Sequence, residues 1–231
     1  MAAEHDPFPL ALSLVVHELR TPLSVALGYV RMLRREQAGP FSEKQKRMLE
    51  EVERACGRVG TLVDEISDLR KIELGQLALA RQPFDLAAVV VDVAGDMHEG
   101  HDRNVRLVVR GGERPLQIVG DRARIAAAIR VLIHLIMRER ADGVVVADCS
   151  QVEGAPPIAL VVISEESKVQ ELARGRAVDA MVGEWKAGTG FGLPLARRIV
   201  EAHGGTISSA PGDHPEKPRS GLTLRIPLEA T

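Results

Sequence analysis

The segment from His17 to Leu23 reads His-Glu-Leu-Arg-Thr-Pro-Leu and lies within a run of apolar residues at helical spacing. Residues three and four apart on a helix share a face, so Thr21 lies one turn from His17. Glu18 is next to the histidine and offers a general base. The segment therefore places a nucleophile, a carboxylate and a hydroxyl on one helical turn, a combination that favours phosphoryl transfer.

The apolar positions around this segment predict two long helices. The first is expected from about Pro9 to Arg35, ending before Ala38-Gly39-Pro40, and Pro22 should bend it. Ser42 is a suitable N-cap for a second helix that continues to about Leu74. Each helix carries an apolar stripe that one hairpin cannot bury alone. We therefore expect a homodimer in which two hairpins form a four-helix bundle.

His-Glu-x-x-Thr-Pro-Leu, followed by an amphipathic helix, resembles the H box of sensor histidine kinases. In that family the histidine takes a phosphoryl group and passes it to an aspartate. The resemblance implies that His17 is the phosphoacceptor and that Glu18 orients its ring or takes its proton. It also implies that Thr21, at the family's phosphatase position, aligns water for hydrolysis of an aspartyl phosphate.

After the hairpin, Gly75 and Pro83 mark a linker, and helical and strand patterns then alternate. We expect helices near 86–97, 122–138 and 193–203, a lid-like stretch at 165–187, and strands near 105–110, 143–149, 158–164, 205–209 and 221–228. This order is similar to the Bergerat-type ATPase sandwich of histidine kinases. The predicted fold is α+β with two domains: residues 1–80 form the dimerisation and phosphoacceptor hairpin, and residues 81–231 form an ATPase-like α/β sandwich.

A glycine-rich stretch, Gly188-Thr189-Gly190-Phe191-Gly192-Leu193, resembles the family's G2 box. Glycines before a helix let backbone N–H groups approach phosphate oxygens. The resemblance implies a remnant nucleotide site made of Glu165, Arg138, Gly188, Thr189, Gly190 and Gly192. The alternative is that these glycines serve chain geometry alone.

The helix expected at 122–138 lacks the asparagines of the family's N box. Asp121 and Arg124 match the entry to this box and Arg138 matches its basic end, but Val131 and Leu135 occupy the asparagine positions. Magnesium requires oxygen ligands, which aliphatic side chains do not provide. The only asparagine in the chain is Asn104, which precedes the helix. We expect no metal site in this chain.

The family's adenine-reading loop, Asp-x-Gly-x-Gly, falls on residues 165–169. Ser167 and Val169 replace its glycines, and a β-branched residue does not readily take positive φ. We therefore expect that ATP binding has been lost and that the chain uses no cofactor. ATP and magnesium enter only if Glu165 or Glu166 supports an ATP-dependent autokinase.

Composition excludes several other classes of protein. The 30 basic residues nearly balance the 32 acidic ones, and no basic run is interleaved with aromatics, so nucleic acid is not an expected partner. The apolar runs are far shorter than the roughly 20 residues that span a bilayer, so no membrane contact is expected and a cytoplasmic location is predicted. Cys56 and Cys149 are interpreted as reduced core residues.

These features predict a two-component signalling protein in which His17 exchanges phosphoryl with the aspartate of a response-regulator receiver domain. The expected partners are that receiver domain, a second copy of the chain, and an upstream kinase or sensor. Two alternatives remain open: an ATP-dependent histidine autokinase that phosphorylates His17, and a scaffold that docks signalling partners without being phosphorylated. Whether the chain is an enzyme depends on which of these holds.

Overall fold

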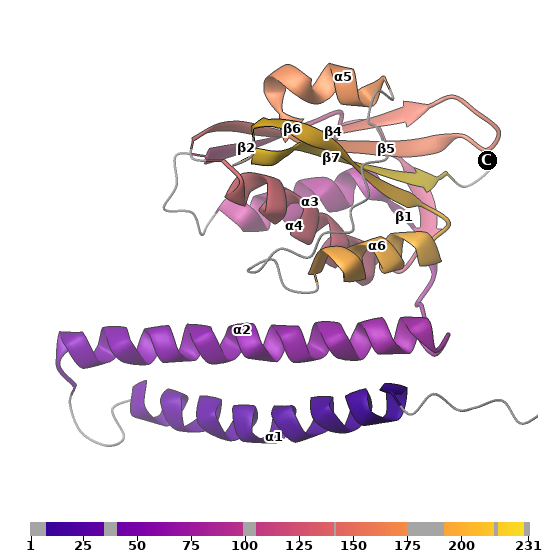
Figure 1. The fold of residues 1–231 in the computed structure, drawn as a ribbon. Helices are drawn as coiled ribbons and strands as arrows, with labels where there is room; N and C mark the ends of the chain where they lie inside the picture. The colour runs from indigo at the N-terminus through magenta and orange to yellow at the C-terminus, as the bar shows by residue number, and fades with distance from the viewer. Residues whose placement is uncertain are drawn as a thin grey trace, which may run out of the picture. The chain divides into compact units, whose positions relative to one another are not determined.

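The computed structural model describes residues 8–34, 41–98, 105–140, 142–174, 192–214 and 217–228, with side chains in the first helix described from residue 18. The chain divides into two compact units, Met1–Leu77 and Ala78–Thr231. The first is a helical hairpin and the second is an α/β domain (Figure 1). The predicted fold class is therefore confirmed.

The hairpin consists of α1 (Phe8–Arg34) and α2 (Glu43–Glu73), which lie side by side. Val30 of α1 and Val63 of α2 are its most buried apolar residues, at 7% and 3% exposure. Gly60 leaves room for α1, since a Cβ at this position would lie 3.4 Å from Leu23 Cδ2. The inner stripe of each helix is therefore used within the hairpin.

Capping interactions define both ends of α2. The side chain of Ser42 accepts a hydrogen bond from Gln45 N, and Gln45 Oε1 accepts one from Ser42 N at 2.8 Å, a capping box. At the other end Gly75 has φ +64°. Its N–H donates to the Ile72 carbonyl. Glycine adopts the positive φ that ends the helix here at little cost. The predicted N-cap at Ser42 is confirmed.

The second unit contains a five-stranded sheet in the order β2-β4-β5-β7-β6 and a separate antiparallel pair, β1 with β3. Only β2 and β4 are parallel within the larger sheet. The strands are β1 (Gln82–Asp85), β2 (Val105–Arg110), β3 (Gln117–Gly120), β4 (Gly143–Val152), β5 (Ile158–Glu165), β6 (Thr206–His214) and β7 (Lys217–Pro227). The helices are α3 (Leu86–His98), α4 (Arg122–Arg138), the 3₁₀ turn η1 (Glu166–Lys168), α5 (Val169–Ala173) and α6 (Gly192–Ala202).

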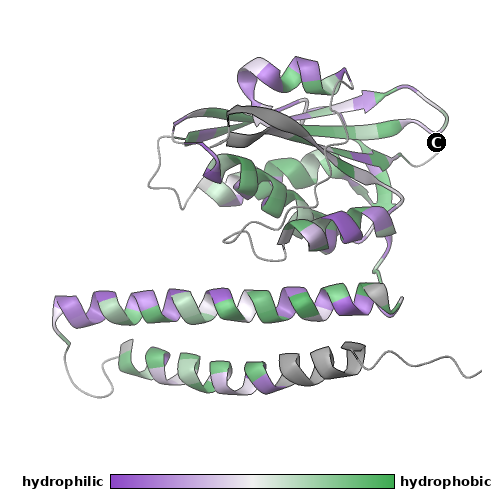
Figure 2. Ribbon diagram, viewed as in Figure 1, coloured by the Kyte–Doolittle hydropathy of each residue, from purple (hydrophilic) through white to green (hydrophobic). Residues whose placement is uncertain are grey.

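Helices cover both faces of the larger sheet. Figure 1 shows α3, α4 and α6 on one face and the short α5 on the other. The central strand β5 is buried from Ala159 to Ser164 without interruption. A strand covered on both sides needs apolar residues at successive positions, which explains its unbroken apolar run. Figure 2 shows that α3 and α4 are largely hydrophobic, whereas hydrophilic and hydrophobic residues alternate along α2.

The predicted helices and strands occur close to their expected positions, and three details differ. The strands β1 and β3 were not predicted, because four residues are too short for a periodic pattern. Part of the lid-like stretch forms η1 and α5, and residues 175–191 lie outside the described part of the chain. Cys149 is buried as expected, but Cys56 is only half-buried on α2.

Gly221→Ala is expected to destabilise the α/β domain. The added Cβ would lie 2.5 Å from Leu172 Cδ1 of α5 and 2.9 Å from the carbonyl oxygen of Ile163. Overpacking of this kind costs about 1–3 kcal/mol. Urea denaturation measures the change in the free energy of unfolding. Gly95→Ala in α3 is the control, because no atom lies within 4 Å of an added Cβ there. Equal effects of the two substitutions would contradict close packing at Gly221.

Candidate functional site

The three residues of the predicted catalytic turn lie within α1. His17 and Glu18 are consecutive, and Thr21 follows one turn later, with Glu18 and Thr21 both exposed. The side chain of His17 lies outside the described part of the structure. The helix continues through Pro22 to Arg34. Because proline has no N–H, the carbonyl of Glu18 lacks its usual helical donor, and the backbone is locally weakened beside His17.

An ion pair joins the two helices next to this turn. Arg20 Nη2 of α1 lies 2.6 Å from Asp64 Oδ1 of α2. Both side chains are more than half exposed, so the pair contributes little to stability, about 0–1 kcal/mol. Its effect is geometric, because it links the turn that carries His17 to a fixed position on α2.

Each helix of the hairpin also carries a second, exposed apolar stripe. Val25, Tyr29 and Met32 recur at helical spacing on α1, and Tyr29 is 63% exposed. The corresponding residues of α2 are Met48, Val52 and Val59. These side chains are 43–63% exposed within the single hairpin. They form a surface that a second hairpin of the same kind is suited to cover.

In the α/β domain, Asp121 and His203 hold three segments together. Asp121 caps α4 by accepting a hydrogen bond from Arg124 N at 3.1 Å, and its other oxygen accepts one from Ala80 N. The N–H of Asp121 donates to His203 Nε2 at 2.9 Å. His203 Nδ1 in turn lies 2.6 Å from the carbonyl oxygen of Ile199 in α6. Asp121 and His203 therefore have structural roles.

This network requires neutral His203. Nε2 must accept a hydrogen bond from Asp121 N–H, so Nδ1 carries the ring proton and donates to the Ile199 carbonyl. Burial lowers the pKa of His203, and the hydrogen bond to Ile199 partly opposes that shift. Arg81 and Arg124 also lower the pKa of His203, whereas Asp121 raises it. Protonation would remove the acceptor for Asp121 N–H.

The residues at the family's magnesium positions do not fit a magnesium ion. Leu135 is buried at 5% exposure and Val131 is half-buried, and neither side chain has an oxygen atom. Arg138, at the end of α4, is exposed. Among the residues that the structure describes, no group of three His, Cys, Asp or Glu side chains is arranged to hold a metal.

The segment that corresponds to the adenine-reading loop has a different structure from an open glycine loop. Ser167 lies in η1, and Val169 begins α5 with φ −52°. The carboxylate of Glu165 is paired with Arg140 Nη1. The next carboxylate, Glu166, is paired with Arg110 of β2. Glu165 is therefore already bound by a cation from its own chain.

The predicted phosphate-binding glycines are only partly covered by the structure. Gly188, Thr189 and Gly190 lie outside the described residues. Gly192 is the first residue of α6 and is buried. The structure thus brings Glu165 to the end of β5, Arg138 to the end of α4 and Gly192 to the start of α6.

Sequence reasoning did not identify Arg140 as part of this region. Arg140 follows the last residues of α4, where a charged side chain is usually solvated, yet its side chain is 8% exposed. Its second nitrogen, Nη2, lies 3.5 Å from the Ser220 carbonyl oxygen in β7. No local motif signals this position, because both partners are distant in the sequence.

The comparisons with known proteins agree with this architecture. Residues 11–75 match the His Kinase A (phospho-acceptor) domain. The sensor protein GacS of Pseudomonas syringae pv. syringae is 29% identical over 230 residues, a match that covers 91% of this chain and 24% of GacS. The chain therefore spans about a quarter of the length of this relative.

Two solved structures share the fold. Full-length ShkA in complex with AMPPNP aligns with a TM-score of 0.68 and 19% identity over 96% of this chain and 47% of ShkA. The histidine kinase AdeS of Acinetobacter baumannii aligns with a TM-score of 0.60 and 22% identity over 93% of this chain and 98% of the AdeS chain.

A phosphoacceptor hairpin followed by an ATPase-like α/β domain defines the catalytic core of a sensor histidine kinase. Residues 11–75 match the phospho-acceptor domain of histidine kinases, and most of the chain is similar to sensor kinases such as GacS. None of the helices within the described residues is both long and apolar enough to cross a bilayer.

The α/β domain is expected to lose stability as the pH falls through the titration of His203. Because burial lowers the folded-state pKa of His203, the unfolded chain binds the proton more readily. This contribution is fully present above about pH 6.5 and is lost as the pH falls towards the lower folded-state pKa.

Urea denaturation at about pH 7.5 and about pH 5.5 measures this dependence. His203→Gln retains an acceptor but does not titrate, so its stability should depend less on pH in this range. His203→Ala leaves Asp121 N–H without its acceptor and should cost about 1–3 kcal/mol at either pH. An identical pH dependence in the wild type and His203→Gln would contradict the assignment.

Proposed function

We propose that the chain is a two-component phosphotransfer core in which His17 exchanges phosphoryl with the aspartate of a receiver domain, without ATP bound to the chain. The observation that supports this most is the turn of α1 that carries His17, Glu18 and Thr21 within a match to the phosphoacceptor domain. Glu18 and Thr21 are exposed, as residues that meet a partner protein must be.

In the transfer reaction a ring nitrogen of His17 attacks the phosphorus of the regulator's aspartyl phosphate. A P–N bond forms, the P–O bond to the aspartate breaks, and the aspartate leaves as a carboxylate. Glu18 orients the ring or takes the proton that it releases, a contribution typical of a positioned acid–base group. The reverse sequence of steps returns phosphoryl to a regulator.

In the hydrolytic reaction Thr21 replaces His17 as the active group. Its hydroxyl aligns a water molecule against the aspartyl phosphate, so water becomes the nucleophile and inorganic phosphate is released. Transfer and hydrolysis both draw on the regulator's own magnesium. Neither step needs a nucleotide on this chain.

The state of the α/β domain supports the loss of ATP binding. Val131 and Leu135 provide no magnesium ligand, Glu165 is paired with Arg140, and Val169 is held in a helical conformation. The domain retains the sandwich fold while the positions that would contact nucleotide have changed. We infer that the α/β domain stays folded without serving as a nucleotide site.

The competing function is an ATP-dependent autokinase. It is favoured by the fold similarity to ShkA, whose structure contains AMPPNP, and by the glycine-rich stretch that precedes α6. Under that function His17 would be labelled from ATP in the absence of any regulator. Under the phosphotransfer function the label reaches His17 only from a phosphorylated receiver domain.

His17→Ala is expected to abolish transfer of label from a phosphorylated cognate receiver domain, because it removes the nucleophile. Glu18→Ala should slow transfer by about 10²–10⁴-fold. Thr21→Ala should slow hydrolysis of the regulator's phosphate but retain transfer to His17. Rapid mixing followed by electrophoresis separates the labelled species.

Circular dichroism of each variant verifies that the fold is unchanged. Label that still reaches the His17→Ala chain would contradict the role of His17. A wild-type chain that docks to its regulator without exchanging phosphoryl would favour the scaffold.

We also propose that the chain is a homodimer joined through the exposed stripes of the hairpin. Val59→Glu, on the α2 stripe, should shift the protein to monomer, because an unpaired charge in an apolar interface costs several kcal/mol. Light scattering at decreasing protein concentration measures the mass. Arg54→Glu is the control: Arg54 is 62% exposed and pairs with Glu51, away from the stripe. A wild-type chain that is monomeric throughout would overturn the four-helix bundle.

A further inference from the structure

We propose that Arg140 is an internal ligand of the Glu165 carboxylate, on the face of the sheet that α3, α4 and α6 cover. By binding this carboxylate, Arg140 fixes the segment after β5 in an arrangement that does not bind nucleotide. The inference rests on one part of the proposed function, the loss of ATP binding. It does not depend on phosphoryl transfer by His17.

Arg140 joins three elements of the domain. It follows α4, its Nη1 pairs with Glu165 at the end of β5, and its Nη2 lies 3.5 Å from the Ser220 carbonyl oxygen in β7. The hydroxyl of Ser164 donates to the same carbonyl at 2.7 Å. A guanidinium presents planar N–H donors to a carboxylate. The amino group of a purine also presents N–H donors, so the two would compete for the same carboxylate.

The position of Glu165 on β5 determines which side of the sheet its carboxylate faces. Side chains alternate along a strand, so Glu165 lies on the face opposite to Val162. Val162 packs beneath α5. Glu165 therefore faces the side of the sheet that α3, α4 and α6 cover (Figure 1). Arg140, which follows α4, pairs with it there.

An incoming base cannot easily displace Arg140 from this carboxylate. Arg140 remains charged at any physiological pH, and its side chain is 8% exposed, against 30% for Glu165. Breaking a buried pair by removing one partner leaves an uncompensated charge, which is strongly unfavourable. A neutral amino group on a base offers a weaker hydrogen bond to the carboxylate than the guanidinium does.

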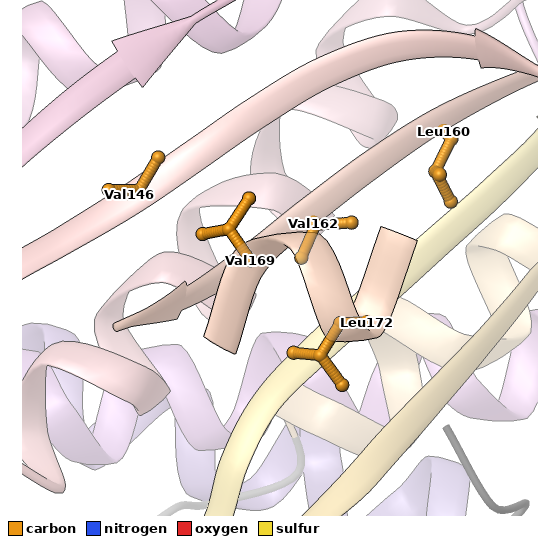
Figure 3. Packing of buried hydrophobic residues seen from close by; sticks show 5 residues of the cluster. All are labelled: Val146, Leu160, Val162, Val169 and Leu172. Carbon is orange, nitrogen blue, oxygen red and sulfur yellow. The ribbon is translucent and has the colours of Figure 1, made fainter. Parts of the chain in front are cut away.

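The segment that follows Glu165 is anchored on the outer face of the sheet. Figure 3 shows Val169 and Leu172 of α5 against Val146, Leu160 and Val162. Val169 and Leu172 are buried at 4% and 3% exposure. Gly221 leaves the space that Leu172 occupies. Val169 and Leu172 therefore pack on the face of the sheet opposite to the Glu165 carboxylate and do not surround a base there.

The adjacent carboxylate provides a matched comparison. Glu166 pairs with Arg110, but their side chains are 57% and 45% exposed. An exposed pair contributes little, because solvent screens it. Arg110 and Arg140 therefore bind neighbouring carboxylates in the same sequence, and only Arg140 does so in a buried position.

Hydrogen–deuterium exchange of the full chain, with and without millimolar Mg-ATP, tests the proposal. In the wild type the amides of residues 166–173 should be protected, and Mg-ATP should not change their exchange rates. Arg140→Ala should accelerate exchange in this segment by about 100-fold. Arg110→Ala should change it by about fivefold or less. Equal effects of the two substitutions, or protection of residues 166–173 by Mg-ATP, would overturn the proposal.

A paired substitution keeps the test decisive if Arg140→Ala unfolds the domain. Arg140→Met combined with Glu165→Leu removes both charges, and a buried pair replaced by apolar residues of similar size often leaves stability unchanged. The double variant should fold and protect residues 166–173 to within about fivefold of the wild type. A double variant as unstable as Arg140→Ala would contradict mutual dependence of the pair.

Phosphoryl transfer from a labelled receiver domain, measured on the same samples, separates this proposal from the proposed function. Transfer that fails while the exchange pattern is as expected would reject the function of His17 alone. Transfer that succeeds while Arg110→Ala and Arg140→Ala behave alike would reject the role of Arg140 alone.

Discussion

Burial of β5 on both faces is the constraint on which the α/β domain depends. The strand is covered from Ala159 to Ser164 by α4 on one side and by α5 on the other. Apolar burial of this extent is the dominant favourable term in folding. The burial of β5 also determines where the residues after Ser164 leave the covered part of the sheet. Glu165 emerges at the edge of the covered region, where it meets Arg140, and the chain then turns towards the outer face.

This arrangement separates the two functions that a histidine kinase core combines. The chemistry proposed for the hairpin needs only His17, Glu18 and Thr21 on one turn of α1. Nucleotide binding instead needs ligands from several elements of the sheet domain, and a change in any of them is damaging. The first arrangement is local and survives changes elsewhere, whereas the second is distributed. Phosphotransfer without ATP binding is a chemically consistent outcome of this difference.

Local patterns in the sequence were sufficient to predict the long helices and strands, and the proposed catalytic turn is also a local pattern of a few consecutive residues. The amphipathic period of α4 and the capping residue Ser42 are expressed within a few consecutive residues, and both were predicted correctly. The replacement of family asparagines by Val131 and Leu135 was equally visible. The contact between Arg140 and Glu165 was not, because it joins residues 25 apart in the sequence and depends on burial. The short strands β1 and β3 were missed because four residues are too few to show a periodic pattern.

Calorimetric titration of the full chain with Mg-ATP is the most direct test of the central claim that the α/β domain has lost the ability to bind ATP. Trp185 is the only tryptophan in the chain and gives a parallel fluorescence signal. If ATP binding has been lost, the titration gives no saturable heat and no magnesium-dependent change in fluorescence up to millimolar ATP. A saturable, magnesium-dependent signal in both measurements would contradict it and would establish the autokinase as the better description.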